Sequence, residues 1–280
     1  MLGAITGDIL GSRFEFNSIK STTFDLFGRG CRYTDDSAMT MAVAEWLLDD
    51  PSHSHELLEQ KMVKYGELDP DAGYGGKFYD WLFNPTRLWS DGKRRPYNSW
   101  GNGSAMRVSA VGWMFKSIEE TERVAEISAS ITHNHSEGIK GAQATAAAIF
   151  MARNGANKDE IRDYVSNKFQ YDLKRTIEQI RPDYNFEVSC QKSVPEAIIS
   201  FLEGKDYEST IRLAISLGGD ADTQACIAGG IAEAFYGMPD DLVSDIGYHL
   251  LPVYKNNIIS LAENSAYRRY REQFRRCWRL

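Results

Sequence analysis

Apolar residues recur along most of the chain at the spacing of one face of an α-helix. Positions i, i+3 and i+4 are apolar in the segments 38–48, 121–131, 139–153, 193–203, 206–216 and 223–236. Only two short segments, 21–27 and 186–190, have the composition of strands, and strands do not alternate with helices along the chain. The pattern therefore predicts an all-α bundle.

Nothing in the sequence divides this bundle. No linker and no change in composition interrupts the 280 residues, so we expect a single domain over residues 1–280. The longest stretch without periodicity is 66–104, which is rich in Gly, Tyr, Trp and Asn. Irregular stretches of this length in a compact domain are usually functional or poorly ordered.

The first helical pattern carries glycine at every fourth position. Gly3, Gly7 and Gly11 lie on one stripe, and each glycine inside a helix costs up to ~1 kcal/mol relative to alanine. The repetition indicates that another helix approaches this stripe closely. Glu15 lies about 40° from Gly11 around the same helix, if the helix continues that far. An exposed glutamate is the commoner situation, so the spacing alone does not assign Glu15 a role.

Net charge and cysteine content argue against several classes of protein. The net charge is −7, which argues against sequence-independent binding to nucleic acid or to an anionic membrane. The four cysteines lack C-x-x-C spacing and no histidine cluster accompanies them, so we expect reduced thiols and neither disulfides nor a zinc site. No signal-peptide pattern and no run of about 18 apolar residues is present. We expect a cytoplasmic protein without membrane contact.

Two similar acidic clusters open apolar helical segments. One is Thr34-Asp35-Asp36, and the other is Asp220, Asp222 and Thr223 after Gly218-Gly219. Either cluster alone is typical of a helix cap. However, one cap needs one side chain, the helices that follow are almost wholly apolar, and no Lys or Arg lies in their first turns. Carboxylates near a core need a cation.

The metal chemistry of these clusters depends on whether they meet. If they do, four carboxylates and two hydroxyls form an all-oxygen site suited to Mg²⁺ or Mn²⁺, with Ca²⁺ as an alternative. Four carboxylates would accommodate two ions. Spacing along one sequence does not establish that the clusters converge.

Six ordered motifs resemble the ADP-ribosylglycohydrolase family of dinitrogenase-reductase-activating and ADP-ribosyl-acceptor hydrolases. They are GAITGDILGSRFEF (3–16), YTDDSAMTMAVA (33–44), DPDAGYG (69–75), SWGNGSAMRVSAVG (99–112), ITHNHSEGIKGAQA (131–144) and SLGGDADTQACIAGGIAEAFYG (216–237). The resemblance covers nearly the whole chain. It implies a compact, orthogonally packed helical bundle with a dimetal site at helix N-termini.

The resemblance also implies roles for the acidic residues. Two divalent cations, Mg²⁺ or Mn²⁺, would lie between the two clusters, with Thr34, Asp35, Asp36, Asp220, Asp222 and Thr223 as the metal-binding residues. Glu15 matches a glutamate beside the metals and is the expected general acid/base. Glu15, Asp35 and Asp36 are therefore the expected catalytic residues.

Substrate-binding residues follow from the same resemblance. The glycine-bearing loop Ser99, Trp100, Gly101, Asn102, Gly103 and Ser104 would cradle a pyrophosphate, helped by the N-terminus of the helical stretch after it. By itself, such a loop is usually a plain turn. Trp100 matches an aromatic residue that stacks on adenine, and Tyr97 is a candidate second wall. Gly73, Tyr74 and Gly75 would border the distal ribose and phosphates, and His133 the adenosine or phosphate end.

The function implied is hydrolysis of the C1″ glycosidic or ester bond of an ADP-ribosylated protein or small molecule, with ADP-ribose as product. The GYG and WGNGSAMR segments are more similar to the serine, poly(ADP-ribose) or O-acetyl-ADP-ribose type than to the arginine type. The alternatives are an ADP-ribose-binding or immunity protein with little catalysis, and a metal phosphohydrolase that cuts the pyrophosphate. A nucleic-acid substrate stays open although nothing in the sequence indicates one, and a monomer is expected.

The end of the chain is rich in arginine and aromatic residues. Six Arg lie between 268 and 279, and Tyr267, Tyr270, Phe274 and Trp278 share one helix face. We expect a terminal helix that docks its aromatic face on the core. The alternative is a basic patch that contacts an ADP-ribosylated nucleic acid or an acidic protein.

Overall fold

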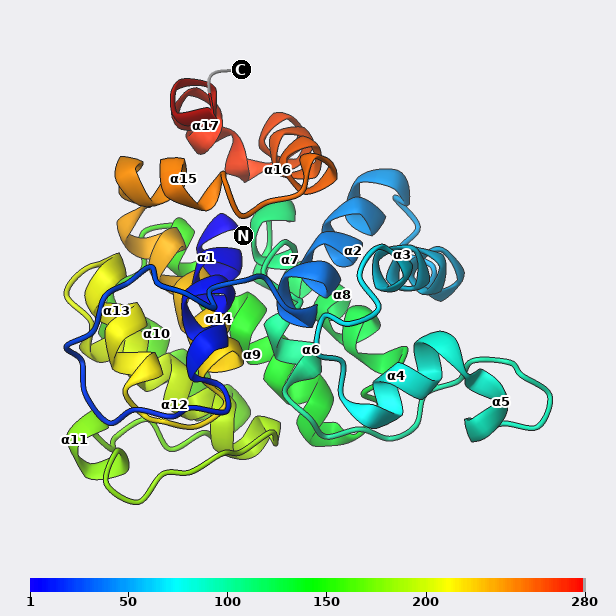
Figure 1. Ribbon diagram of the computed structural model, residues 1–280, viewed down its shortest axis with the longest axis horizontal. Helices are drawn as coiled ribbons and strands as arrows, with labels where there is room; N and C mark the ends of the chain where they lie inside the picture. Colours follow the sequence, from blue (N-terminus) through cyan, green and yellow to red (C-terminus); the bar gives the residue numbers. More distant parts are fainter. Residues whose placement is uncertain (279–280) are drawn as a thin grey trace.

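The fold is built around two central helices that pack against each other along their length. We describe residues 1–278 of it from a computed structural model. Helix α1 (Leu2–Gly11) lies beside α14 (Ala221–Tyr236) in the middle of the molecule (Figure 1). All 10 residues of α1 are buried. An apolar helix surrounded by others is the expected centre of an all-α core.

The glycine stripe explains this contact. A Cβ atom added at Gly7 would lie 2.0 Å from the carbonyl oxygen of Ala225, and one at Gly11 would lie 2.5 Å from the carbonyl oxygen of Ala221. A Cβ at Gly3 would meet the Gly229 carbonyl at 2.6 Å. The predicted close approach is therefore confirmed. Only glycine lets the two backbones come this near.

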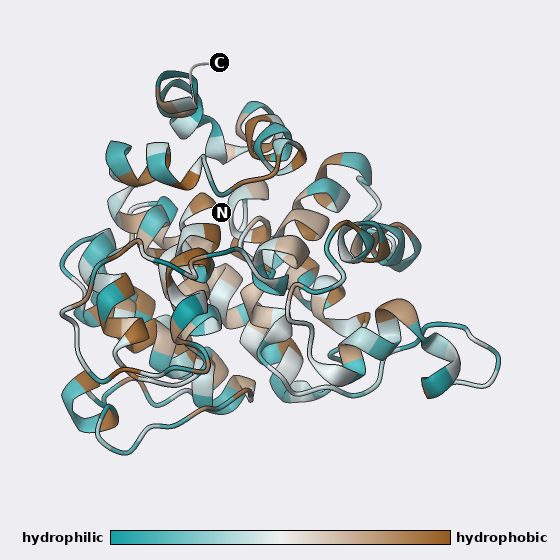
Figure 2. Cartoon of the chain, in the orientation of Figure 1, coloured by the Kyte–Doolittle hydropathy of each residue, from teal (hydrophilic) through white to brown (hydrophobic). Residues whose placement is uncertain are grey.

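The remaining helices surround this pair. The longer ones are α2 (Asp35–Asp49), α3 (His55–Leu68), α8 (Ile118–Ser130), α9 (Ser136–Arg153), α10 (Lys158–Phe169), α12 (Cys190–Glu203), α13 (Tyr207–Ile215) and α16 (Pro252–Asn264). Shorter elements connect them: η1 (Ser12–Phe14), α4 (Gly76–Phe83), α5 (Pro85–Leu88), α6 (Gly103–Met106), α7 (Val111–Met114), α11 (Ile177–Ile180), α15 (Asp240–Ile246), η2 (Ala266–Tyr270) and α17 (Arg271–Trp278). Most large apolar side chains are buried, and hydrophilic residues are concentrated on the outer helices and loops (Figure 2).

The six helices predicted from periodicity are all present, within a few residues of their expected bounds. The two strand candidates were wrong. Residues 21–27 are irregular, and around 186–190 the backbone makes a single isolated bridge, Gly101 to Ser189. Within residues 1–278 no β-strand is formed, because these segments have no partner strand to complete a ladder.

The stretch 66–104 is more ordered than its composition indicated. It contains the end of α3, all of α4 and the short α5. Trp81 of α4 is fully buried, and its indole N–H donates to the carbonyl of Arg95 at 3.1 Å. The guanidinium of Arg94 lies over the Trp81 ring, 5.7 Å from its centroid. Tertiary contacts thus hold a segment that has no periodic pattern.

The C-terminal segment docks through its aromatic side chains, as predicted. Tyr267, Tyr270 and Phe274 are buried and their rings contact one another. Several arginines pair with acids, as in Arg276 with Asp240 at 2.7 Å. Arg279, the last of the six arginines, lies outside the described residues. No helix within residues 1–278 has the length and apolar content needed to cross a membrane.

Candidate active site

The first acidic cluster is held in place by a buried carboxylate of α1. Asp8 accepts hydrogen bonds from the Thr34 backbone N–H at 3.0 Å, the Thr34 hydroxyl at 2.7 Å and the Ser37 backbone N–H at 3.1 Å. The Ser37 hydroxyl donates to the same carboxylate. Burial raises the pKa of Asp8 to about 6, and these four hydrogen bonds oppose the shift. Asp8 therefore fixes the first turn of α2 on the central helix.

The capping role at this turn belongs to the threonine. The Asp36 backbone N–H donates to the Thr34 hydroxyl oxygen at 3.3 Å, and Thr34 is the N-cap of α2. The side chains of Asp35 and Asp36 are free for another role. At the second cluster, Asp220 is the N-cap of α14, but its side chain makes no capping hydrogen bond. Capping therefore does not account for the four aspartates.

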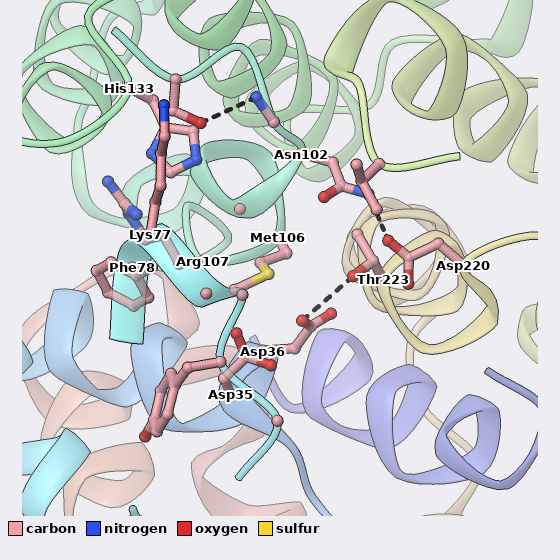
Figure 3. Close-up of a pocket in the computed structure, with 18 of the residues that line it drawn as sticks. Asp35, Asp36, Lys77, Phe78, Asn102, Met106, Arg107, His133, Asp220 and Thr223 are labelled. Carbon is pink, nitrogen blue, oxygen red and sulfur yellow. Dashed lines mark hydrogen bonds between the residues drawn. The ribbon is translucent and has the colours of Figure 1, made fainter. Parts of the chain in front are cut away.

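The two clusters converge, although more than 180 residues separate them. The Thr223 hydroxyl donates to the Asp36 carboxylate at 3.3 Å, and the Asn102 side-chain amide donates to Asp220 at 2.7 Å (Figure 3). Glu15, Asp220 and Asp222 each place a carboxylate oxygen within 4.8 Å of the others. The left-handed conformation of Gly218, with φ +67°, turns the chain from α13 into this second cluster.

The acids of the site have no salt-bridge partner in the part of the chain that the structure describes. The salt bridges of residues 1–278 include none of Glu15, Asp35, Asp36, Asp220 or Asp222. One Asp36 oxygen is buried without a hydrogen-bond partner. Burial and neighbouring carboxylates raise the pKa values of Asp35, Asp36 and Asp222 well above their usual range. Burial raises the pKa of Glu15 to about 8, with Asp222 as the next cause.

The donor set fits hard divalent cations. It consists of carboxylate and hydroxyl oxygens, the ligands that Mg²⁺ and Mn²⁺ prefer, and the described site residues add no thiol or imidazole to it. The unpartnered Asp36 oxygen is the atom that such an ion would satisfy. Without a cation, ionising these acids together would be strongly unfavourable.

A cavity of about 630 Å³ opens from the acidic cluster. Most of the sequence-predicted site residues line it: Glu15, Asp35, Asp36, Gly73, Tyr74, Gly75, Tyr97, Ser99, Trp100, Gly101, Asn102, Gly103, His133, Asp220, Asp222 and Thr223. Its volume and its mixture of apolar walls with convergent polar groups are typical of a small-molecule site. Two predicted residues lie elsewhere. Thr34 is buried against Asp8, and the Ser104 hydroxyl donates to the Gly138 carbonyl at 2.6 Å inside the protein.

Glycines shape the walls of this cavity. Gly73 has φ +109°, a conformation that other residues rarely adopt. A Cβ at Gly103 would lie 3.2 Å from Nε2 of His133, so glycine lets the loop pack against this ring. Burial, with Arg107 nearby, lowers the pKa of His133 well below its usual range, which makes it a neutral imidazole. The helix after the loop, α6, has only four residues and supplies little dipole.

Sequence reasoning missed several residues of the site. Asp8 was not singled out, although an aspartate inside an apolar, glycine-striped helix is a signal for a buried role. Asn102, which was predicted to bind substrate, lines the cavity, and its side-chain amide also donates to Asp220, a contact that the sequence did not predict. Lys77, near the start of α4, lines the cavity (Figure 3). Phe16 and Phe186 also line it, from segments that show no common pattern in the sequence.

Comparisons with known proteins agree on one family. The family model described as ADP-ribosylglycohydrolase matches residues 1–275. ADP-ribosylhydrolase ARH3 of Mus musculus is 30% identical, over 85% of this chain and 83% of its own length. The Homo sapiens protein of the same name is 28% identical over 85% and 84%.

Two further likenesses extend the comparison. ADP-ribosylarginine hydrolase Tri1 of Pseudomonas putida is 25% identical, over 89% of this chain and 73% of its own length. A solved structure described as an ADP-ribosylglycohydrolase-related protein complex has a TM-score of 0.70 and 20% identity, and covers 94% of each chain. At 20% identity, this structural similarity shows the fold alone.

Proposed function

The chain belongs to the ADP-ribosylglycohydrolase family, and from that premise we propose that it is a metal-dependent hydrolase that cleaves the C1″ bond of ADP-ribosylated acceptors and releases ADP-ribose. The observation that carries the proposal is that five carboxylates, none of them in a salt bridge with a Lys or Arg of residues 1–278, line one cavity of about 630 Å³. A protein that only recognises ADP-ribose has no need for this buried charge. Catalysis at a dimetal site needs such a cluster of carboxylates to bind the two ions.

The residues proposed to hold two Mg²⁺ or Mn²⁺ ions are Asp35, Asp36, Asp220, Asp222 and Thr223. When bound, the ions supply positive charge that orients ribose hydroxyls and lowers the pKa of a water molecule. The Thr34 hydroxyl donates to Asp8 and its oxygen accepts from the Asp36 N–H. We therefore assign Thr34 to positioning the aspartates, and Asn102 to positioning Asp220.

Glu15 is the proposed general acid/base. It lies beside Asp220 and Asp222 at the edge of the cluster, and it is only partly buried, so it is open to the cavity. Cleavage of a glycosidic bond at C1″ needs a proton at the departing atom and passes through an oxocarbenium-like state. Glu15 borders the cavity beside Asp220 and Asp222, a place from which its carboxyl group could deliver that proton.

The rest of the cavity is proposed to hold the pyrophosphate and adenosine. The glycine segments 73–76 and 101–103 let backbone N–H groups approach an anion closely. Lys77 adds a cation on the same wall. Trp100, which is 47% exposed at the cavity, offers a ring face to the adenine. Neutral His133 closes the wall behind Gly101 and Gly103 without adding charge.

The test is a panel of ADP-ribosylated substrates assayed with Mg²⁺, Mn²⁺ or EDTA, in which released ADP-ribose is quantified. We expect release with either ion and none after thorough metal removal. Glu15→Gln and Asp36→Asn should abolish release and retain the helical circular-dichroism spectrum. AMP as the product would identify a pyrophosphohydrolase, and binding without any product would identify a reader. Either result would overturn the proposal.

A further inference from the structure

Arg107 is a buried cation on the wall of the cavity, and its partners are not acids. Its side chain is fully buried, and no salt bridge of residues 1–278 includes it. One guanidinium nitrogen, Nη2, donates to the backbone carbonyls of Ser128 at 2.7 Å and Ala129 at 3.5 Å. Both carbonyls belong to the last turn of α8, where the helix dipole attracts a cation. The end of α8 therefore stabilises the charge of Arg107.

Two hydrogen bonds in series join Arg107 to His133. Nη2 of Arg107 also donates to the hydroxyl oxygen of Thr132 at 3.0 Å, and that oxygen lies 2.7 Å from Nδ1 of His133. Arg107 and Thr132 are fully buried, and His133 is almost so. Water has little access to these hydrogen bonds, so the protein itself determines their direction.

The donors and acceptors present determine which ring nitrogen of His133 carries a proton. A guanidinium only donates, so the Thr132 oxygen accepts from Arg107. The Thr132 hydroxyl has one proton, and its only other side-chain partner within residues 1–278 is Nδ1 of His133, which therefore accepts it. Burial, with Arg107 as the second cause, lowers the pKa of His133 well below its usual range, so the ring is neutral. A neutral imidazole whose Nδ1 accepts carries its proton on Nε2.

Nε2 of His133 lies against the glycine segment of the cavity. Cβ atoms placed on Gly101 and Gly103 would lie 3.6 Å and 3.2 Å from Nε2. Both glycines and His133 line the cavity, and no hydrogen bond to Nε2 is formed within residues 1–278. His133 and Arg107 lie away from Asp220 (Figure 3). The Nε2–H group is therefore available to a ligand oxygen beside the segment proposed above to receive the pyrophosphate.

We propose that Arg107 and Thr132 are positioning residues that hold His133 in its Nε2–H tautomer, so that this N–H donates to a phosphoryl oxygen of ADP-ribose. The inference rests on the proposal above that the cavity binds ADP-ribose. A phosphoryl oxygen only accepts hydrogen bonds, and the opposite tautomer of His133 would direct a lone pair at it. Arg107 thus acts on the ligand through two other residues.

The first measurement is the tautomer itself, in the ligand-free wild-type protein with Mg²⁺ present. Long-range proton–nitrogen NMR spectra distinguish protonated from unprotonated ring nitrogens, and a His133→Gln variant identifies the His133 signals among those of the five histidines. We expect a protonated Nε2 and an unprotonated Nδ1 between about pH 6 and pH 8, the range in which an ordinary histidine loses its charge. A proton on Nδ1, or an even mixture of the two tautomers, would overturn the inference.

The second measurement is the Kd for ADP-ribose in variants of Thr132. Thr132→Val removes the hydroxyl, so His133 should populate both tautomers and the Kd should rise about tenfold, as expected for weakening a hydrogen bond to a charged acceptor. Thr132→Ser keeps the hydroxyl and should restore both the tautomer and the affinity. Adding Thr132→Val to His133→Ala should not weaken binding further, because Thr132 acts through that ring. Fully additive losses would overturn the inference.

Thr121→Val is the matched control. Thr121, on α8, is also fully buried, and its hydroxyl donates to the Ser117 carbonyl at 2.8 Å, but it does not line the cavity. We expect this variant to lose stability, as Thr132→Val does, and to bind ADP-ribose as tightly as the wild-type protein. A tautomer change in Thr132→Val without a change in the Kd would show that Nε2–H does not contact the ligand, and would also overturn the inference.

Fragments of the ligand test which oxygen accepts from Nε2. Thr132→Val should weaken the binding of ADP and leave the binding of adenosine unchanged. Weaker adenosine binding would place the Nε2–H group on the nucleoside and overturn the phosphoryl assignment. These outcomes are distinguishable from failure of the proposed function. A wild-type protein that binds ADP-ribose but releases none from any substrate would refute only the hydrolase, and the tautomer is measured without ligand or catalysis.

Discussion

Replacing Asp8 by alanine tests whether the site depends on a residue that need not touch substrate. Asp8 is fully buried and accepts four hydrogen bonds from Thr34 and Ser37, at the turn that carries Asp35 and Asp36. The alanine variant leaves two backbone N–H groups and two hydroxyls without an acceptor. The start of α2 then loses these hydrogen bonds to α1.

The expected loss of stability follows from these contacts. A hydrogen bond to a charged acceptor contributes about 1.5–3 kcal/mol, and losses within one network are not additive. The cost of burying Asp8, visible in its pKa of about 6, offsets part of the gain. We expect the metal-free protein to lose about 3–5 kcal/mol, the range for breaking a buried polar network. Asp8→Asn keeps one acceptor oxygen and should lose less.

The assay combines urea unfolding of the metal-free protein with calorimetric titration of Mn²⁺. Besides the loss of stability, we expect Mn²⁺ affinity to fall by about 10- to 100-fold, as for other residues that orient metal ligands. Asp50→Ala is the matched control. Asp50 accepts from the backbone and hydroxyl groups of Ser52 and Ser54 just beyond the other end of α2. That variant should lose stability but bind Mn²⁺ normally. If Asp8→Ala also binds Mn²⁺ normally, Asp8 has no positioning role.

Three further predictions concern charge and packing. Without metal, the free energy of unfolding should fall as pH rises, because the folded-state pKa values of Asp220 and Glu15 are raised to about 6 and about 8. The stability that these protonated acids contribute should be complete below about pH 4 and lost as pH rises through about 8, and Mn²⁺ should stabilise the protein more at about pH 8 than at about pH 5. Urea midpoints in EDTA that do not change with pH would contradict this prediction. Lys77→Ala should raise the Kd for ADP-ribose about three- to tenfold at low salt and much less at 1 M salt, and an effect independent of salt would refute a role in binding phosphate. Gly7→Ala would place a Cβ 2.0 Å from a carbonyl of α14 and should cost about 3 kcal/mol or more in urea unfolding, whereas Gly76→Ala, which meets nothing within 4 Å, should not.

Periodicity predicted the helices that bury a broad face, because such a face leaves a strong pattern. Helix α14 is buried over nearly its whole surface, and its apolar run is plain in the sequence. Helix α10 was missed because it buries only Ile161, Val165 and Phe169, one residue per turn among charged neighbours. Helices of the core can therefore be predicted from apolar periodicity, whereas the half-exposed helices around the core are predicted poorly.

The candidate site was predictable in its chemistry but not in its geometry. Two acidic clusters on apolar helices indicated a cation, yet Asp36 and Thr223 are 187 positions apart and meet only through tertiary packing. The prediction that the two clusters lie together came from the family resemblance. Asp8 escaped notice for a related reason. Its role depends on donors 26 and 29 positions further along the chain, and one sequence does not show which donors a buried acid will find.

The pairing of α1 with α14 has a consequence for how the protein is made. Residues 2–11 leave the ribosome about 210 residues before residues 221–236, a delay of roughly 10–40 s at 5–20 residues per second. A 10-residue helix is too short to be stable alone in water. During that interval the apolar, glycine-rich segment has no partner to bury it. Synthesis of this protein therefore includes a period in which its future centre is open to chaperones, and the residues proposed to bind metal are brought together only after most of the chain has been translated.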